Sequence, residues 1–336
     1  MCGAAEKTRR LYRIAPLFWR VFHIADLSQC ERYTEAMTIF KVIVLALIQG
    51  LAELLPVSSS AHVVVAEKLM GLDPSSPEMT LLLVMLHTGT MFAVLVYFWK
   101  TWKKVYFSSR DAFRRFAILV IWATLLTGIV GEVLKKIIEK TLFRGAPKAE
   151  IELLFSHLEL IAPALAAAGV LIVIAGLAEK RKQERAVAHG QKLRTGEGTL
   201  TLKQAGWMGL VQGLALPFRG FSRSGSTIST GMLAGAAKEP AERFSFALAV
   251  VLTPPVVLME ALRLVHAAHA ASAAGTPIDL HAAFVTSLLG AVFSFIAGLL
   301  ALKWLSSWLE SGRWHWFGIY CLIASGVVFY LHGRGF

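Results

Sequence analysis

Six runs of about twenty apolar residues, separated by short charged stretches, constrain this chain more than any other feature. A helix needs about 20 mostly apolar residues to cross the hydrocarbon core of a bilayer. The runs therefore predict an all-α integral membrane protein. The predicted spans are Leu81–Trp99, Phe116–Leu134, Leu158–Ala178, Phe244–Val265, Ala282–Leu302 and Trp316–Leu331.

Charge is scarce in this chain and lies mainly between the apolar runs. Only 17% of the residues are charged, whereas soluble domains carry about a quarter. The net charge of +12 is explained by Lys and Arg in cytoplasmic loops, which set the orientation of membrane proteins. Because no basic-aromatic module accompanies this charge, we expect no nucleic-acid partner. Cys2, Cys30 and Cys321 lack the spacing of metal ligands or redox pairs.

Two further apolar stretches are interrupted. Ile39–Leu55 and Ala205–Leu216 each end at a proline that is followed by a run rich in serine. Helix-like sequence resumes near Ala61–Leu69 and Thr227–Ala237. Broken helices occur at membrane depth only where protein or water satisfies the freed backbone groups. Each interruption therefore predicts a re-entrant helical hairpin.

The two interruptions resemble each other, which indicates an internal repeat. Gln49-Gly50-Leu51-Ala52 recurs as Gln212-Gly213-Leu214-Ala215. Three uninterrupted spans follow each hairpin, so one unit crosses the membrane an odd number of times. The second copy is then expected to be inverted relative to the first. An inverted repeat places a binding site near the bilayer midplane, where the broken helices meet.

The charged loops predict which side of the membrane each connection faces. Lys100–Arg115 and Glu179–Lys203 are rich in Lys and Arg and are expected to be cytoplasmic, whereas the loop between Val265 and Ala282 has neither and is expected outside. The basic loop Lys135–Lys148 does not fit this alternation. The predicted organisation is an N-terminal extension over 1–36, a first repeat over 37–178, a basic cytoplasmic loop over 179–203 and a second repeat over 204–336.

Two interpretations of the extension over residues 1–36 stay open. Its short mixed segment, Leu11–Ile24, contains arginines and is too brief to span a bilayer, so it fits an interfacial helix. Alternatively, translation starts at Met37, directly before the first apolar run.

The first interruption carries an acid in an apolar setting. Gln49 and Glu53 are four residues apart and share one helical face. An ionisable residue at membrane depth is costly and usually marks a functional site, although a Glu near a helix end can also reach water. The serines that follow could simply cap the next helix, and a histidine alone could be a core residue. Their proximity favours one shared site, and they are Ser58, Ser59, Ser60 and His62.

The second interruption combines flexible backbone, hydroxyl groups and two guanidinium groups at a predicted helix N-terminus. Backbone N–H groups and the helix dipole favour an anion there, and arginine binds phosphate oxygens in a bidentate manner. The alternative is an ordinary loop whose arginine reaches lipid headgroups. Together the two hairpins contain what phosphoryl transfer to water requires. The candidate phosphate-binding residues are Arg219, Gly220, Ser222, Arg223, Ser224, Gly225 and Thr227.

At these residues, the chain from about Thr38 to the C-terminus resembles the bacterial undecaprenyl-diphosphate phosphatases, the bacitracin-resistance family. The family's (Glu/Gln)-x-x-x-Glu motif stands as Gln49 to Glu53, followed by its Leu-Pro-Val-Ser-Ser-(Ser/Thr)-x-His motif at 55–62. Its Pro-Gly-x-Ser-Arg-Ser-Gly-x-Thr motif stands at Arg219–Thr227. His87–Thr90 in the next span is also similar to the family.

The resemblance implies an inverted-repeat membrane phosphatase that converts the C55 isoprenoid diphosphate to the monophosphate carrier of cell-wall synthesis. Removal of the diphosphate would confer bacitracin resistance. The implied location is the bacterial inner membrane, with the active site facing the periplasm. The expected partners are the polyprenyl diphosphate lipid, the bilayer and, as an open alternative, a second copy of the chain.

The resemblance also implies roles for individual residues. Glu53 and Gln49 would hold a divalent cation, Mg²⁺ or Ca²⁺, and Arg223 would hold the diphosphate. The implied nucleophile or proton carrier is Ser59, Ser60 or His62. The implied catalytic set is Glu53, His62, Ser59, Ser60 and Arg223. The implied substrate-binding set is Gln49, Ser58, Arg219, Gly220, Ser222, Ser224, Gly225 and Thr227.

Two departures from the family pattern stand out. Arg219 replaces the expected proline, with one residue apparently inserted after Pro217, so it would bring a second guanidinium to the phosphates or re-route the loop. Gln49 stands where some members have Glu, so Glu53 is the one acid of its motif. With one carboxylate, a Mg²⁺ ion would rely on phosphate oxygens and water.

The main alternative function is a polyprenyl-phosphate transporter or flippase, because inverted repeats with broken helices are typical of transporters. A phosphatidic-acid-phosphatase type of enzyme is disfavoured, since its Lys-x6-Arg-Pro motif is missing. A structural scaffold is disfavoured because it would not place polar clusters at membrane depth.

Overall fold

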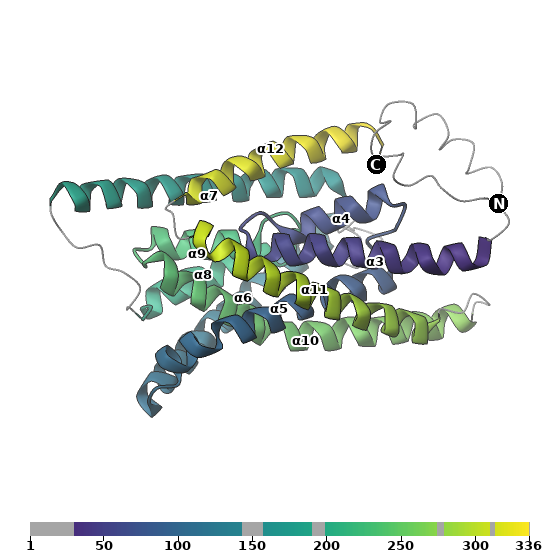
Figure 1. Cartoon of the computed structure of the whole chain (residues 1–336), viewed down its shortest axis with the longest axis horizontal. Coiled ribbons are helices and arrows are strands. Elements are labelled where there is room, and N and C mark those ends of the chain that lie inside the picture. Colours follow the sequence, from purple (N-terminus) through teal and green to yellow (C-terminus); the bar gives the residue numbers. More distant parts are fainter. Residues whose placement is uncertain (1–29, 143–156, 190–198, 274–278, 310–312, 336) are drawn as a thin grey trace. The chain divides into compact units, whose positions relative to one another are not determined.

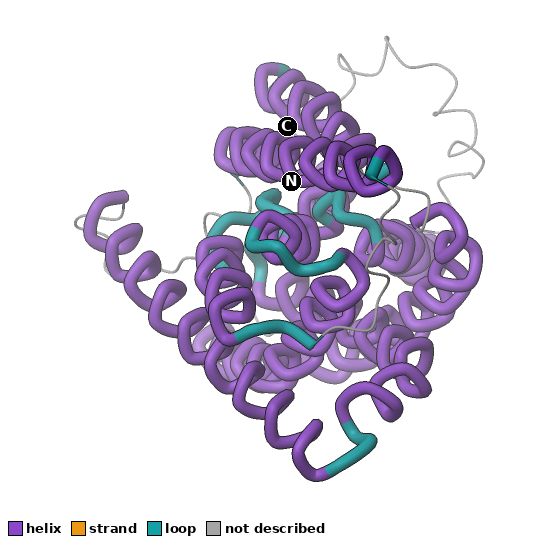
Figure 2. The backbone as a smooth tube through the Cα atoms, turned by 90° about the vertical axis from the view of Figure 1, so that its left-hand side faces the viewer, coloured by secondary structure: helices purple, strands orange, loops and turns teal. Residues whose placement is uncertain are grey.

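A computed structural model of the chain describes residues 30–142, 157–189, 199–273, 279–309 and 313–335. Within these ranges helices are joined by short loops, and no strand is present (Figure 2). By its contacts the chain divides into Met1–Phe40 and Lys41–Phe336. All packing described below lies within Lys41–Phe336.

The helices follow one another in the same order in both halves of the chain (Figure 1). Each half begins with one arm of a broken helix, continues with a short helix of 11 residues, and ends with three long helices. In the first half these are α3 (Cys30–Leu54), α4 (Ser59–Leu69), α5 (Pro77–Tyr106), α6 (Arg110–Leu142) and α7 (Leu158–Ala188). In the second half they are α8 (Leu202–Ala215), α9 (Arg223–Leu233), α10 (Lys238–Ala273), α11 (Leu280–Leu309) and α12 (Trp314–Gly333).

The long helices confirm the predicted membrane spans. In the part of the chain that the structure describes, six helices are long and apolar enough to cross a bilayer, namely α5, α6, α7, α10, α11 and α12. Both interruptions are also present, between α3 and α4 and between α8 and α9. The protein is therefore an all-α, multi-pass membrane protein. The inversion of the second half relative to the first stays a prediction.

Several helices extend beyond the apolar runs that predicted them. α6 continues to Leu142, so the first residues of the segment Lys135–Lys148 are helical and not loop; residues 143–156 lie outside the described part. Lys135 and Lys136 form pairs with glutamates one turn away, at 3.9 and 3.4 Å, which support a helix outside the apolar core.

The same extension occurs at other helix ends. α7 runs past Ala178 to Ala188, so the expected loop over 179–203 begins as helix. α3 begins at Cys30, so residues 30–36 of the expected N-terminal extension are helical, while residues 1–29 lie outside the described part. An apolar run marks the part of a helix in lipid, not the ends of the helix.

The arms of the two broken helices pack against the opposite halves of the chain. A Cβ added to Gly50 of α3 would lie 2.4 Å from the Cβ of Ala297 on α11. A Cβ added to Gly213 of α8 would lie 2.7 Å from the Cβ of Val130 on α6. Glycine is required at both positions because the helices approach so closely. Since α6 and α11 occupy the same place in their halves, the halves interleave reciprocally.

Candidate active site

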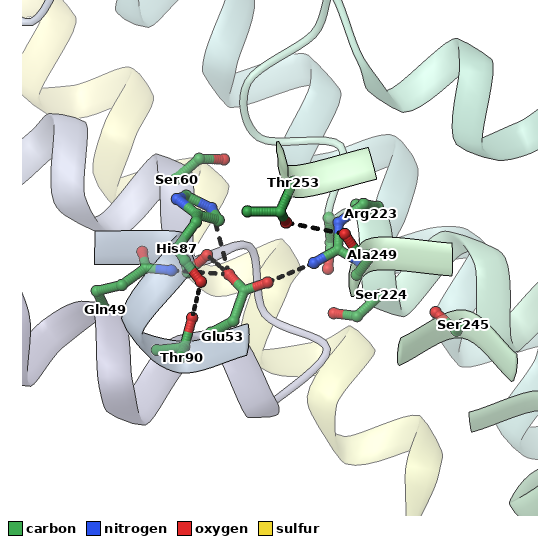
Figure 3. Close-up of polar contacts among 12 residues, drawn as sticks. Gln49, Glu53, Ser60, His87, Thr90, Arg223, Ser224, Ser245, Ala249 and Thr253 are labelled. Carbon is green, nitrogen blue, oxygen red and sulfur yellow. Dashed lines mark hydrogen bonds and ion pairs between the residues drawn. The ribbon is translucent and has the colours of Figure 1, made fainter. Parts of the chain in front are cut away.

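A single buried carboxylate lies at the centre of the polar cluster (Figure 3). Glu53, near the end of α3, is 4% exposed. Its Oε2 accepts hydrogen bonds from Gln49 Nε2 at 2.9 Å and from Ser59 Oγ at 2.5 Å. Its Oε1 accepts from Arg223 Nη2 at 2.5 Å, and His87 Nε2 lies 3.3 Å from Oε2. The two hairpins, which are 170 residues apart in sequence, therefore meet at one ion pair.

The backbone of the first hairpin turns Ser59 towards Glu53. α3 ends at Leu54, and the chain reverses through Ser58, which has φ 65° and ψ 81°. This left-handed conformation costs a non-glycine residue roughly 1–2 kcal/mol. It lets α4 begin at Ser59, so that the hydroxyl of its first residue reaches the carboxylate of the preceding arm.

The second hairpin repeats this turn. Ser222 has φ 43° and caps α9, accepting a hydrogen bond from Gly225 N at 3.2 Å. A Cβ at Gly225 would lie 3.0 Å from the carbonyl oxygen of Pro56, so glycine allows the two hairpins to touch. Gly220 has φ +108°, a conformation that disfavours other residues.

Hydroxyl groups form hydrogen bonds to the first turn of α9. Thr227 Oγ1 donates to the Arg223 carbonyl at 2.8 Å and lies 2.6 Å from Ser245 Oγ on α10. Ser226 Oγ also donates to the Arg223 carbonyl, at 3.2 Å. Thr227 thus positions Arg223. The contacts of Thr227 with described residues do not include Glu53.

Two helix N-termini converge on this cluster. α4 begins at Ser59 and α9 begins at Arg223, and both residues contact Glu53. The first N–H groups of a helix have no partner within it, and the helix dipole adds partial positive charge there. Arg223 Nη1 is buried and has no hydrogen-bond partner in the described part of the chain. The site therefore offers several donors to a phosphate group.

Some predicted residues are directed away from Glu53. His62 Nδ1 donates to the Ser58 carbonyl at 2.8 Å, and its Nε2 accepts from the hydroxyl of Tyr320 on α12 at 2.7 Å. Both ring nitrogens are thus engaged elsewhere, and His62 supports the turn at Ser58. Ser60 Oγ lies 3.4 Å from Ser58 Oγ, and its hydroxyl points away from Glu53 in Figure 3.

Arg219 belongs to a different pair. Its charge interacts with Glu67, a fully buried residue of α4. The described partners of Glu53 are Gln49, Ser59, His87 and Arg223 and do not include Arg219. Arg219 therefore interacts with an acid other than Glu53, and the two outcomes expected for this departure, a second guanidinium at the phosphates or a re-routed loop, stay predictions.

His87 is the site residue that the interpretation of the hairpins missed. It lies on α5, outside both interruptions, and donates through Nδ1 to the Leu83 carbonyl at 2.8 Å. That bond directs Nε2 towards Glu53. The sequence held one signal, the likeness of His87–Thr90 to the family, but spacing along the chain could not place it beside Glu53.

The cluster can be tested for the divalent cation that the resemblance implies. Both oxygens of Glu53 accept hydrogen bonds, while the amide oxygen of Gln49 is buried without a hydrogen-bond partner. Among the described residues no group of three or more His, Cys, Asp or Glu side chains is placed to hold an ion. The donor set therefore fits a cation that shares the oxygens of a bound phosphate, and it does not form a closed site of protein ligands alone.

Comparisons with known proteins identify the family of the chain. Undecaprenyl-diphosphatase 2 of Acinetobacter baylyi is 55% identical over 295 residues, covering 88% of this chain and 98% of that protein. Undecaprenyl-diphosphatase of Desulfatibacillum aliphaticivorans is 34% identical and undecaprenyl-diphosphatase 2 of Burkholderia thailandensis is 33% identical, each over 86% of this chain and 96% or 95% of the relative. Residues 42–328 match the family of the bacitracin resistance protein BacA, and the chain belongs to that family.

Proposed function

We propose that the protein is a membrane phosphatase that hydrolyses undecaprenyl diphosphate to undecaprenyl phosphate and inorganic phosphate. This reaction recycles the lipid carrier of cell-wall synthesis and confers bacitracin resistance. One observation carries the proposal: the Ser59 hydroxyl donates to a buried carboxylate that is also held by an arginine of the other hairpin. A transporter needs the anion pocket but has no use for a hydroxyl placed on a base.

Binding of the diphosphate is assigned to the second hairpin and the two helix ends. Arg223 keeps Nη2 on Glu53 and has Nη1 available for a phosphate oxygen. The N–H groups at the starts of α4 and α9 add donors on either side. In a water-poor site such donors also stabilise the charge that develops during phosphoryl transfer.

The chemical step is assigned to Ser59 and Glu53. Glu53 Oε2 takes the proton of the Ser59 hydroxyl as Oγ forms a bond to the terminal phosphorus. The bond from that phosphorus to the bridging oxygen breaks, and undecaprenyl phosphate leaves with the proton that Glu53 took, so that Glu53 is again a carboxylate. Water then attacks the phosphoserine and gives a proton to Glu53, the bond from phosphorus to Oγ breaks, and Glu53 returns this proton to Ser59 as inorganic phosphate is released. Ser60 and His62 have no contact with Glu53 that would support the same role.

We propose Mg²⁺ or Ca²⁺ as the cofactor. Glu53 and the amide oxygen of Gln49 would hold it together with diphosphate oxygens. When bound, it would neutralise phosphate charge.

Phosphate release from undecaprenyl or farnesyl diphosphate by the purified protein in detergent tests the proposal. We expect turnover by the wild type and its loss in Ser59→Ala, with the variant still folded. Lipid movement across vesicles without any phosphate release would instead establish the transporter or flippase.

We also propose that the protein lies in the bacterial inner membrane with its site open to the periplasm. A cysteine introduced as Ser60→Cys should react with a membrane-impermeant thiol reagent added to spheroplasts. Labelling only after the membrane is opened would place the site on the cytoplasmic side.

A further inference from the structure

A second charged cluster lies between α5 and α10, apart from the site around Glu53. Arg263 Nη1 donates to Thr80 Oγ1 at 3.2 Å and lies 3.6 Å from Glu260 Oε2. Thr80 belongs to α5, and its hydroxyl donates in turn to the Pro77 carbonyl at 3.0 Å. Glu260 and Arg263 lie on α10, within a helix that is apolar enough to span a bilayer.

This cluster is aligned with the active site along both helices. α5 and α10 are antiparallel, because Phe98 packs on Phe246 at one end while Thr80 meets Arg263 at the other. Thr80 precedes His87 by seven residues, and seven residues are nearly two helical turns, so both lie on one face of α5 about 10 Å apart. The cluster is therefore a second polar level, two turns from the first.

α10 repeats this relation. Thr253 lies beside Arg223 in Figure 3, and Glu260 follows Thr253 by seven residues, about two turns further along α10 and beyond Pro254 and Pro255. The two levels are thus presented by the same two helices, with the second nearer the end where α5 begins and α10 ends. A ligand that arrives from the end where α5 begins and α10 ends meets Arg263 before it meets Arg223.

Burial separates the roles of the two charged residues. The Glu260 side chain is 7% exposed, whereas that of Arg263 is 19% exposed, close to the 21% of Arg223. The carboxylate of Glu260 is therefore buried, whereas the guanidinium of Arg263 is partly accessible. Charged side chains in membrane segments are costly and usually mark substrate or ion pathways.

We propose that Arg263 is a second phosphate-binding residue, which holds the diphosphate headgroup of the lipid before it reaches Arg223. Glu260 holds the guanidinium in place while no ligand is bound, and Thr80 fixes its direction. An arginine presents several N–H donors in a planar fork, so Arg263 can exchange its ion pair with Glu260 for phosphate oxygens while it keeps Nη1 on Thr80. This inference rests on the proposed phosphatase function, because it concerns the same substrate.

The proposal predicts opposite effects for the two charged residues. Arg263→Gln should raise KM for undecaprenyl diphosphate about tenfold, the typical contribution of one charge-assisted contact, with kcat little changed. Glu260→Gln should lower KM by about two- to fivefold, because the competing carboxylate is gone. If the trio only tied α5 to α10, both variants would lower the melting temperature and impair turnover alike.

Direct binding makes the test independent of turnover. We would measure farnesyl diphosphate binding to Glu53→Ala protein in detergent, with and without Arg263→Gln, and use Arg181→Gln on the exposed part of α7 as the matched control. Weaker binding with Arg263→Gln and unchanged binding with Arg181→Gln support the proposal. Equal binding in all three, or parallel losses of stability in the Arg263 and Glu260 variants, would overturn it.

The same measurements distinguish a failure of the proposed function from a failure of the proposal for Arg263. If the wild type releases no phosphate from any diphosphate, the proposed function fails, while the binding comparison still decides whether Arg263 holds the headgroup. If the wild type is active and Arg263→Gln keeps its KM, the proposed function stands and this inference fails.

Discussion

The two hairpins have similar backbone conformations but different functional side chains. Ser58 and Ser222 both reverse the chain in the left-handed conformation, with φ 65° and 43°. Gln49 and Gln212 are both fully buried, and the glycine after each allows close packing on a long helix of the other half. An internal repeat of this kind fixes where two turns meet, whatever side chains they carry.

The side chains at matched positions then diverge. Four residues after the glutamine, the first hairpin has Glu53 and the second has Leu216. Directly after the left-handed serine, the first has Ser59 and the second has Arg223. The repeat therefore supplies a meeting point, and the differences between its copies supply the acid, the hydroxyl and the guanidinium. One copy alone contains no complete site.

The largest effect is expected from removal of the charged residues that distinguish the two hairpins. Glu53→Ala and Arg223→Ala should each lower turnover by at least about 10³-fold, because each removes a charge at the reacting phosphate. Leu216→Ala, at the position that matches Glu53, should stay within about twofold of wild type since Leu216 is an exposed apolar residue. Steady-state phosphate release measures all three, and size-exclusion chromatography checks their folding. Near-wild-type turnover in either charge variant contradicts the assignment.

The next prediction separates adjacent hydroxyl groups. Ser59→Ala should lower turnover by roughly 10²–10³-fold, because the group that donates to Glu53 is lost. Ser60→Ala should change it by less than about threefold, since that hydroxyl contributes little to the site. A phosphoserine trapped at Ser59 by acid quench and found by mass spectrometry would support the covalent route. The reverse order of the two variants would assign the nucleophile to Ser60.

The sequence was sufficient for the spans, the two interruptions and the contact between them. Apolar length predicts spans directly, and motif likeness located Glu53 and Arg223. The sequence could not predict the orientation of His62 or the position of His87, because both depend on packing between helices that are distant in sequence. His62 is drawn to Tyr320, 258 residues away, while His87 reaches Glu53 from the facing helix. The interaction partner of Arg219 could not be predicted either, because Glu67 is an acid outside both motifs.

A smaller effect contrasts the paired glutamines. Gln49 Nε2 donates to Glu53, whereas Gln212 Nε2 donates to Thr127 on α6 at 3.2 Å. Gln49→Leu should lower turnover about tenfold, the value of one hydrogen bond to a charged group. Gln212→Leu should leave turnover per folded molecule unchanged and lower stability by about 0.5–1 kcal/mol, as for other membrane hydrogen bonds. Equal losses of turnover in both variants would mean that the glutamines have the same structural role.

The smallest effect concerns the two left-handed serines. Ser58→Gly should raise the melting temperature slightly, since relief of the left-handed strain is worth about 1 kcal/mol and is partly offset by the flexibility of glycine. Ser222→Gly should be closer to neutral, because it also removes the cap on Gly225 N. Thermal unfolding in detergent distinguishes the two. Destabilisation by Ser58→Gly would show that its side chain, and not its backbone, holds the turn.

The central claim is that Glu53 and Arg223, one from each hairpin, act as a single unit. A double-mutant cycle of phosphate release with Glu53→Gln, Arg223→Gln and the combined variant tests it most directly. If they act as a unit, the double variant is no slower than the slower single variant, within about threefold. Losses that multiply in the double variant would show two independent contributions and contradict the account.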